Sequence, residues 1–265
     1  MNYVVADIHG CYEEYMELVQ KIKLSDVDHL YILGDALDRG PESMKVLLDL
    51  MNRQNVTYII GNHDYLFLYF IHKLGLDLSE AENMSEDDIS DFQTYLKDGG
   101  LSSIEAFIKL SEEEKQAVCN FLKEGNVYDD VIVGGKRYVL VHAGISNFSE
   151  DKELDEYDLL DFICERTDYS RRYYRDNNTY VITGHTPTMY INADSSSNVY
   201  IGNGHIAIDC GCIYGGKLAA YCIDDGSITY INAKEDGDWK VGMLDGGIGT
   251  SNGSCRYISN SYSRQ

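Results

Sequence analysis

The stretch HLYILGDALDRG, residues 29–40, joins an apolar run to a polar loop. The apolar residues of 29–33 are typical of a buried strand, and Gly34 ends that strand. Asp35, Asp38 and Arg39 follow it directly. In α/β sheets ligands bind beyond the carboxyl ends of the strands, so these charged side chains are candidates for a binding or catalytic site.

The same arrangement recurs after four other predicted strands. Strand 2–6 leads into DIHG, strand 56–60 into GNHD, strand 137–141 into HAG and strand 180–183 into GHT. Asp is a favoured helix N-cap, so a single such cluster has a structural explanation. Five strand ends that all carry His, Asp or Asn beside glycine favour one shared site. The candidates from these four strand ends are Asp7, His9, Asn62, His63, His142 and His185.

The order of the predicted elements indicates an α/β fold. Helical spacing in residues 11–23 and from Pro41 to Leu50 separates the first three strands, which predicts parallel pairing with helices over the sheet. Residues 75–126 are acidic and carry three helical signals, so they form a predicted helical insertion. Strands return at 127–133, 137–141, 180–183, 199–201, 205–208, 217–223 and 227–231, with a short helix near 156–166.

Composition excludes several classes of protein. The net charge of −22 argues against electrostatic binding to nucleic acid or an anionic membrane. The sequence has no run of 18 apolar residues and no secretory signal, which predicts a cytoplasmic protein. Seven cysteines at scattered spacing predict reduced thiols instead of a disulfide framework.

Aspartate and histidine at these strand ends suit first-row divalent ions such as Mn, Fe or Zn, with asparagine as an additional oxygen ligand. Two ions need a bridging carboxylate, and Asp35 is the candidate. In two-metal hydrolases the ions lie ~3.5–4 Å apart and hold the attacking and leaving oxygens of an in-line displacement. Water bound between them loses its proton near pH ~7.

The motifs ADIHG, GDALDRG, GNHD, HAG and GHT resemble the PPP-type metallophosphoesterases. That family includes protein serine/threonine phosphatases, bacteriophage-type protein phosphatases and symmetrical dinucleoside tetraphosphatases. The resemblance covers residues 1–232 and implies a four-layer α/β/β/α sandwich with two mixed sheets. We expect one catalytic domain over 1–232, which includes the insertion 75–126, and a partly flexible tail over 233–265. Ala6 and Asp64 depart from the family, where glycine and, in animal enzymes, glutamate are usual.

The resemblance implies a role for each candidate residue. Two divalent ions, with Mn preferred over Fe or Zn, would be held by Asp7, His9, Asp35, Asn62, His142 and His185, and Asp35 would bridge them. Arg39, Asn62 and Arg166 would bind the substrate phosphate, with Arg171, Arg172 and Arg175 as alternatives to Arg166. His63 would protonate the leaving group and Asp38 would orient His63. The structural alternatives are helix caps for Asp7, Asp35 and Asp64, and a surface salt bridge for Asp38 and Arg39.

The expected activity is hydrolysis of phosphomonoesters, with phosphoserine and phosphothreonine in proteins as the preferred substrates. A hydroxide that bridges the two ions would attack phosphorus in line. The alternative activity is symmetrical hydrolysis of dinucleoside tetraphosphates, such as diadenosine tetraphosphate. Residues 75–126 contain few basic side chains for a long polyanion, which favours a phosphoprotein over a dinucleoside polyphosphate. The expected substrate is a phosphoprotein or a phosphorylated small molecule. A third alternative is a metal-binding scaffold without catalytic activity.

Overall fold

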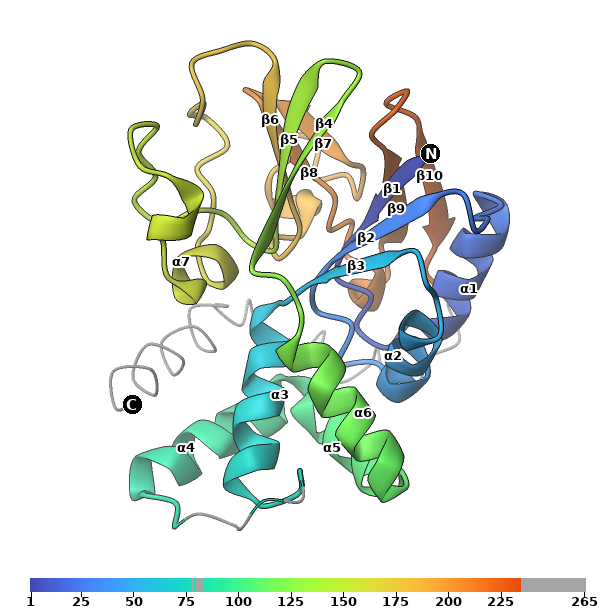
Figure 1. Cartoon of the computed structure of the whole chain (residues 1–265), viewed down its shortest axis with the longest axis vertical. Helices are drawn as coiled ribbons and strands as arrows, with labels where there is room; N and C mark the ends of the chain where they lie inside the picture. The colour runs from blue at the N-terminus through green and yellow to red at the C-terminus, as the bar shows by residue number, and fades with distance from the viewer. Residues whose placement is uncertain (78, 80–82, 235–265) are drawn as a thin grey trace.

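The computed structural model describes residues 1–77, 79 and 83–234, so most of the expected tail over 233–265 lies outside the described residues. Two five-stranded sheets form the centre of the molecule, with helices outside them and a helical layer at one end (Figure 1). The first sheet has the strand order β10-β9-β1-β2-β3, and the second has the order β4-β5-β6-β8-β7.

Both sheets are mixed, with a parallel centre. In the first sheet β1, β2 and β3 are parallel to one another; β9 pairs antiparallel with β1, and β10 pairs antiparallel with β9. Its strands are β1 (Asn2–Val5), β2 (His29–Leu33), β3 (Val56–Ile59), β9 (Lys217–Cys222) and β10 (Ile228–Asn232). In the second sheet β5, β6 and β8 are parallel, and β4 and β7 are antiparallel edge strands. Its strands are β4 (Tyr128–Val133), β5 (Lys136–Val141), β6 (Thr179–Thr183), β7 (Tyr200–Gly202) and β8 (His205–Ala207).

The alternation of side chains along the strands divides the core in two. Val4 of β1 packs in a cluster between the two sheets, whereas its neighbour Val5 belongs to the larger cluster on the helical side. Leu140 and Val141 of β5 divide in the same way. Successive residues of a strand point to opposite faces, so these apolar runs bury both faces of each sheet.

Helices cover the outer faces. The helix α1 (Tyr12–Lys21) packs on β9 and β10, and α2 (Ser43–Met51) packs beside α1. On the second sheet, α7 (Leu159–Ile163) stacks Phe162 on Tyr128 of β4 at 5.3 Å between ring centroids. The remaining helices are α3 (Asn62–Lys73), α4 (Glu86–Tyr95), α5 (Leu101–Ile108) and α6 (Glu112–Lys123).

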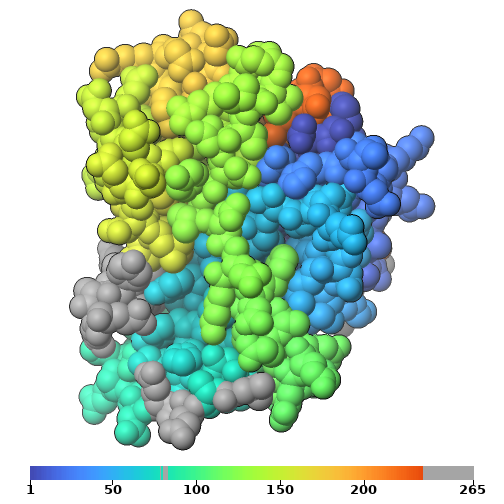
Figure 2. Space-filling view, in the orientation of Figure 1, coloured from blue at the N-terminus to red at the C-terminus, as the bar shows by residue number. Residues whose placement is uncertain are grey.

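We call residues 86–123 the helical segment. Ser85 and Ser111 cap α4 and α6 by accepting backbone N–H bonds three residues on, as expected from their S-x-x-D and S-x-x-E sequences. A π-helical turn, Leu96–Gly100, joins α4 to α5, and Gly99 inside it has a φ of 104°. In Figure 2 this region occupies the end of the molecule below the two sheets.

The predicted architecture of two mixed sheets with helices outside is confirmed. The differences are local: α2 begins at Ser43 and not at Pro41, and α7 spans only 159–163 of the predicted 156–166. Cys11, Cys119, Cys210 and Cys222 are free thiols. Within the described ranges, no helix has both the length and the apolar character needed to cross a bilayer.

Candidate active site

Six of the predicted site residues lie in strained backbone near the strand ends. Positive φ angles between 45° and 68° occur at Asp7, His9, Asp35, Asp38, Arg39 and His185. For residues other than glycine such angles cost about 1–3 kcal/mol each, and they persist where the surrounding structure fixes them, often at active sites. All of these side chains are buried except that of Arg39, which is 12% exposed. The backbone therefore places polar side chains inward at an energetic cost.

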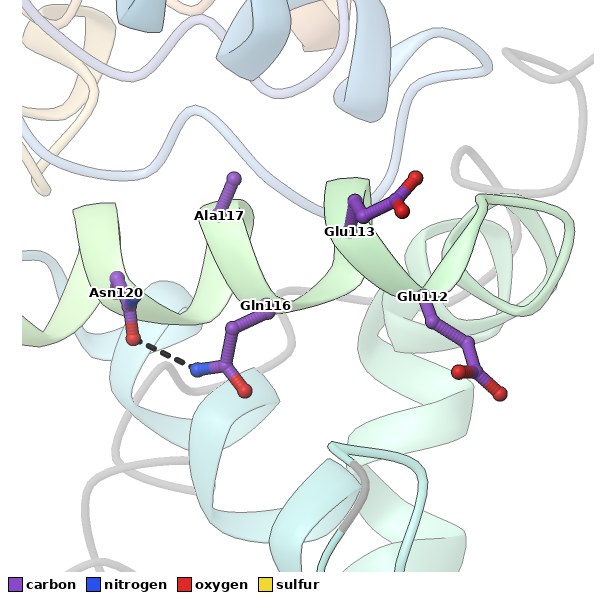
Figure 3. A pocket seen from close by; sticks show the side chains of 5 residues that line it. All are labelled: Glu112, Glu113, Gln116, Ala117 and Asn120. Carbon is purple, nitrogen blue, oxygen red and sulfur yellow. Dashed lines mark hydrogen bonds between the residues drawn. The ribbon is translucent and has the colours of Figure 1, made fainter.

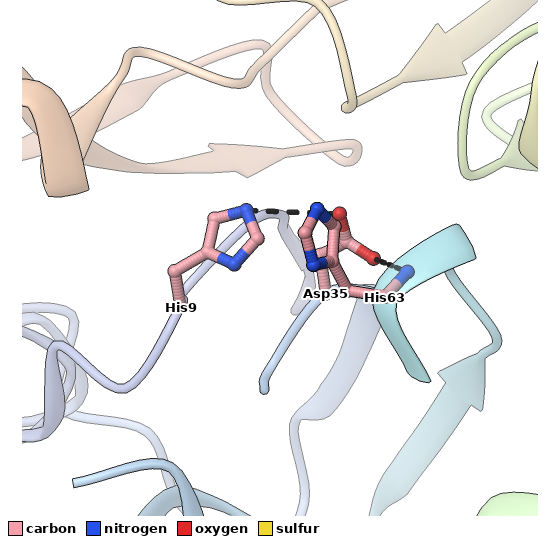
Figure 4. A group of neighbouring side chains, drawn as sticks. All are labelled: His9, Asp35 and His63. Carbon is pink, nitrogen blue, oxygen red and sulfur yellow. Dashed lines mark hydrogen bonds and ion pairs between the residues drawn. The ribbon is translucent and has the colours of Figure 1, made fainter. Parts of the chain in front are cut away.

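Asp35 lies at the centre of this cluster. Its Oδ2 atom is 3.6 Å from Nε2 of His9 and 3.6 Å from Nε2 of His142. Its Oδ1 atom accepts the backbone N–H of His63 at 3.0 Å. Figure 4 shows His9 and His63 gathered at Asp35. A Cβ atom at Gly61 would lie 2.1 Å from Oδ1 of Asp35, so glycine is required there.

Two groups of ligand atoms share Asp35. One group is Asp35, His142 and His185, and the other is His9, Asp35 and His63. In the first group, Nε2 of His142 and Nδ1 of His185 each lie 2.9 Å from Oδ1 of Asn62. Atoms bound to one ion at about 2.1 Å lie about 3.0–3.4 Å from each other, so this spacing suits a common metal ion. The shared position of Asp35 is the one expected of a bridging ligand.

The histidine tautomers also suit metal binding. Nδ1 of His9 lies 2.7 Å from the carbonyl oxygen of Leu37, and Nδ1 of His142 lies 2.7 Å from that of Leu33. A carbonyl only accepts, so Nδ1 donates in both rings and Nε2 keeps its lone pair toward the cluster. Burial lowers the pKa of both histidines, which keeps them neutral. The residues present therefore fit divalent metal ions.

Asp7, also predicted as a metal ligand, is buried and lies near the charge of Asp35. Both of its carboxylate oxygens accept the backbone N–H of His185, at 3.0 and 2.9 Å, and it belongs to neither group of ligand atoms. Burial and the nearby charges of Asp209 and Asp35 raise the pKa of Asp7 well above its usual value. Carboxylates this close to one another are stabilised when a cation lies among them.

Asp38, His63 and Arg39 form a connected set beside Asp35. Oδ2 of Asp38 lies 2.8 Å from Nδ1 of His63. The Arg39 guanidinium donates from Nη2 to Nε2 of His63 at 2.8 Å and from Nη1 to Nε2 of His9 at 2.6 Å. Cζ of Arg39 lies 5.6 Å from the centroid of the Tyr214 ring. Arg39 thus lies between the candidate proton donor and a candidate metal ligand, where a phosphoryl group would bind.

The groups around His63 act on its pKa in opposite directions. Burial and Arg39 lower the pKa of His63, but the carboxylates around it raise the pKa by more, so it lies above its usual value. These carboxylates are Asp35, Asp38 and Asp98. A raised pKa suits a general acid that gives a proton to a leaving group near neutral pH.

Arg166 is exposed, and its charge contributes to the lowered pKa of His185, behind burial and His142. Its alternatives are engaged elsewhere: Arg172 donates to Asn177 at 2.9 Å, and Arg175 pairs with Glu150 at 3.3 Å. Arg171 is exposed. This arrangement favours Arg166 as the second phosphate-binding arginine.

Sequence reasoning missed the contribution of the helical segment. Tyr95, Asp98 and Ser103 come from this segment and contact Asp38, Arg39 or His63. The only signal for them was the Gly99-Gly100 pair, which interrupts a helical pattern. Asp209, buried near Asp7, was also missed, because it stands alone between apolar residues.

Asp64 has a structural role, but the prediction that it is a helix N-cap is wrong. It sits at the third position of α3 and not at the N-cap. Its Oδ2 atom accepts the backbone N–H groups of Gly61 and Asp35, each at 2.9 Å, and the hydroxyl of Tyr58 at 2.8 Å. Asp64 therefore joins the ends of β2 and β3.

A shallow hollow on α6 lies apart from this cluster. Figure 3 shows that its lining residues all come from one helix, and we assign it no part in catalysis. They are Glu112, Glu113, Gln116, Ala117 and Asn120.

The chain belongs to the calcineurin-like phosphoesterase family, which it matches over residues 3–207. The resemblance found in the motifs is thereby confirmed, and the protein is a hydrolase of the metallophosphoesterase class.

Two relatives of the chain are bis(5'-nucleosyl)-tetraphosphatases. The asymmetrical bis(5'-nucleosyl)-tetraphosphatase PrpE of Oceanobacillus iheyensis is 28% identical over 248 residues, which cover 82% of this chain and 86% of the relative. The symmetrical bis(5'-nucleosyl)-tetraphosphatase of Buchnera aphidicola subsp. Schizaphis graminum is 35% identical over 146 residues, covering 54% of this chain but only 44% of the relative. These names agree with the alternative substrate expected from the sequence and not with its preferred one.

Solved structures are similar in fold. A candidate diadenosine tetraphosphatase has a TM-score of 0.59 at 20% identity, covering 88% of this chain and 94% of its own. A serine/threonine phosphatase of Saccharomyces cerevisiae has a TM-score of 0.53 at 14% identity, covering 89% and 81%. The TM-scores show that the fold is shared, and at these identities the similarity concerns the fold alone.

Proposed function

We propose that this protein hydrolyses dinucleoside polyphosphates, such as diadenosine tetraphosphate, with the help of two divalent metal ions. The observation that carries this proposal is the position of Asp35 between His9 and His142, with Oδ2 3.6 Å from Nε2 of each. Arg39 and His63 lie beside these three residues. Asp7, His9, Asp35, Asn62, His142 and His185 would hold the ions, with Mn preferred over Fe or Zn. When bound, such ions lower the pKa of water and neutralise charge on a phosphoryl group.

The side chains of the chain itself would bind and protonate the substrate. The Arg39 guanidinium, already between His9 and His63, offers a planar pair of donors to phosphoryl oxygens. Arg166 would add a second positive charge from the side of His185. Nε2 of His63 would give a proton to the leaving oxygen while Asp38 holds Nδ1, since the tautomer is set by that hydrogen bond.

The choice of substrate is supported by the relatives. PrpE of Oceanobacillus iheyensis is similar over most of both chains and is named for bis(5'-nucleosyl)-tetraphosphates. The metal ligands, Arg39 and His63 suit transfer of a phosphoryl group to water from either an anhydride or an ester. The charge of Asp98 is the feature that bears on the choice between these two substrates.

Asp98 favours a second candidate function, hydrolysis of phosphoserine or phosphothreonine in proteins. Its Oδ2 atom lies 3.6 Å from Nε2 of His63, beside the position of the leaving oxygen. A carboxylate there repels a nucleotide leaving group, which is anionic, more than a serine or threonine hydroxyl.

The test is a parallel assay of the Mn²⁺-loaded protein on diadenosine tetraphosphate, a phosphoserine peptide and 4-nitrophenyl phosphate. We expect the highest kcat/KM on the dinucleotide, and a preference for the peptide would select the second candidate. His63→Asn should lower turnover of the phosphoserine peptide most, because its alkoxide leaving group needs the proton, whereas His29→Asn, at the opposite end of β2 from Asp35, should leave all turnover unchanged. A wild-type protein that binds Mn²⁺ and turns over none of the three substrates would be a scaffold.

A further inference from the structure

The helical segment contacts Asp38, the carboxylate that pairs with the candidate proton donor His63. The hydroxyl of Tyr95 donates to Oδ1 of Asp38 at 3.0 Å, in a fully buried position. The other oxygen, Oδ2, lies 2.8 Å from Nδ1 of His63. The two carboxylate oxygens of Asp38 are therefore held by two different parts of the chain.

The ring of Tyr95 is itself fixed. It stacks on Phe70 of α3 at 5.2 Å between centroids and an interplanar angle of 23°, and it is 3% exposed. His63 lies in the first turn of the same helix, so one helix fixes both the tyrosine and the histidine on either side of Asp38. Burial, followed by the charge of Asp38, raises the pKa of Tyr95 well above its usual value, so its hydroxyl keeps the proton that it donates.

The helical segment also supports the strained backbone of residues 38 and 39. The φ angles of Asp38 and Arg39 are 68° and 65°. Oγ of Ser103 accepts the N–H of Asp38 at 2.8 Å, and the carbonyl oxygen of Gly99 accepts the N–H of Arg39 at 3.0 Å. A Cβ atom on Gly99 would lie 2.6 Å from Cγ of Arg39, so only glycine permits this approach.

We propose that Tyr95 is a positioning residue for catalysis: its hydroxyl fixes Asp38 so that Asp38 holds His63 with Nε2 toward the leaving group. The proposal deepens the proposed function, because it takes His63 as the proton donor. A buried carboxylate oxygen that loses its donor is left unsatisfied, and the carboxylate then turns toward other partners. The helical segment thereby helps to position the proton donor, in addition to packing against α2 and α3.

Leaving-group chemistry distinguishes this role from a purely structural one. A serine or threonine alkoxide is a poor leaving group and needs a full proton, whereas 4-nitrophenolate leaves without one. In the Mn²⁺-loaded protein, Tyr95→Phe should lower kcat on a phosphoserine peptide about tenfold with KM unchanged, and lower kcat on 4-nitrophenyl phosphate less than about twofold. An equal loss on both substrates, or no loss on either, would overturn the proposal.

Tyr15→Phe is the matched control. Tyr15 is also fully buried, and its hydroxyl also donates to a carboxylate, that of Asp49 at 2.8 Å, on the outer helices α1 and α2. It should leave both turnover rates unchanged. Thermal unfolding of the two variants should show comparable losses, which separates stability from positioning.

A measurement on the metal-free protein tests the proposal even if the protein turns over none of the three substrates. With ¹⁵N-histidine, the Nδ1–H proton of His63 should give a low-field NMR signal, assigned by its loss in His63→Asn. Tyr95→Phe should shift or broaden this signal, and Tyr15→Phe should not. An unchanged signal in Tyr95→Phe refutes the positioning role, whereas a wild-type protein inactive on all three substrates refutes only the proposed function.

Discussion

Replacing Asp98 by asparagine should move substrate preference toward dinucleoside polyphosphates. Oδ1 of Asp98 lies 3.3 Å from Nη2 of Arg39, and Oδ2 lies 3.6 Å from Nε2 of His63. A leaving oxygen that takes the proton from Nε2 lies about 2.8 Å from that nitrogen, and so about 4–6 Å from the carboxylate. A nucleotide leaving group brings negative charge to this position, whereas a serine hydroxyl brings none.

The size of the effect follows from Coulomb's law. Two like charges about 5 Å apart repel by about 1 kcal/mol in water and about 3 kcal/mol at an effective dielectric constant of about 20. The Asp98 side chain is 36% exposed, so solvent screens part of the repulsion, and about 1–2 kcal/mol is the appropriate range. Asp98→Asn should therefore raise the ratio of kcat/KM for diadenosine tetraphosphate to that for a phosphoserine peptide about 5- to 30-fold.

Asp130→Asn is the matched control, because Asp130 is 34% exposed and pairs with Arg137 at 2.7 Å on the edge strand β4. It should leave the ratio unchanged. The difference between wild type and Asp98→Asn should also shrink at high salt, where exposed charges are screened. A ratio that stays within about twofold of wild type at low salt would refute the electrostatic argument. A parallel fall on both substrates would show instead that Asp98 acts by holding Arg39.

Three further outcomes are expected. In calorimetric titration with Mn²⁺, His142→Ala should lose binding of one of the two ions. Asp35→Asn should lower the affinity for both ions, since Asp35 belongs to both groups of ligand atoms. Wild-type affinity for one ion in Asp35→Asn would contradict a bridging role. In urea unfolding, Phe67→Ala should lose about 3–5 kcal/mol, because Phe67 is fully buried, and Ile132→Ala should lose little, because Ile132 is 76% exposed; equal losses would contradict the packing. The hydrogen bond from the N-terminal ammonium, followed by those from Ser25, lowers the pKa of Asp28 from 3.8 to about 2. The ionised Asp28 therefore stabilises the folded protein above about pH 4, and this stabilisation is lost as the pH falls toward 2. Asp28→Asn should therefore lower the free energy of unfolding by less than about 1 kcal/mol at pH 7 and leave it unchanged at pH 2, as measured by urea unfolding at both pH values.

The sequence predicts the sheets well because their signals are local. The runs at 29–33 and 137–141 are apolar over their length, and burial of both faces requires that composition. The ends of these strands are marked by glycine next to Asp or His, so the cluster around Asp35 also follows from the sequence. Pairing within the second sheet could not be read from periodicity, since β7 and β8 have only three residues each.

The contribution of the helical segment could not be predicted, because it depends on contacts distant in sequence. Tyr95 lies 57 residues from Asp38, and Ser103 lies 65 residues from it. An aromatic residue at helical spacing is ordinarily part of a hydrophobic core, and the ring of Tyr95 does belong to the larger core cluster. Only the folded chain shows that its hydroxyl meets Asp38.

The strained backbone explains why the two cores and the helical segment must act together. Six site residues have positive φ angles, and at about 1–3 kcal/mol each their combined cost is similar to the whole stability of a domain. Asp35 follows directly on β2, whose side chains pack alternately into both cores, so its backbone is fixed by burial on two sides. Asp38 and Arg39 lie further from any strand, and their backbone N–H groups instead find acceptors in Ser103 and Gly99. The helical segment thus does for the proton-donor loop what the two cores do for Asp35, and loss of its contacts to Asp38 and Arg39 should relax that loop while both cores remain.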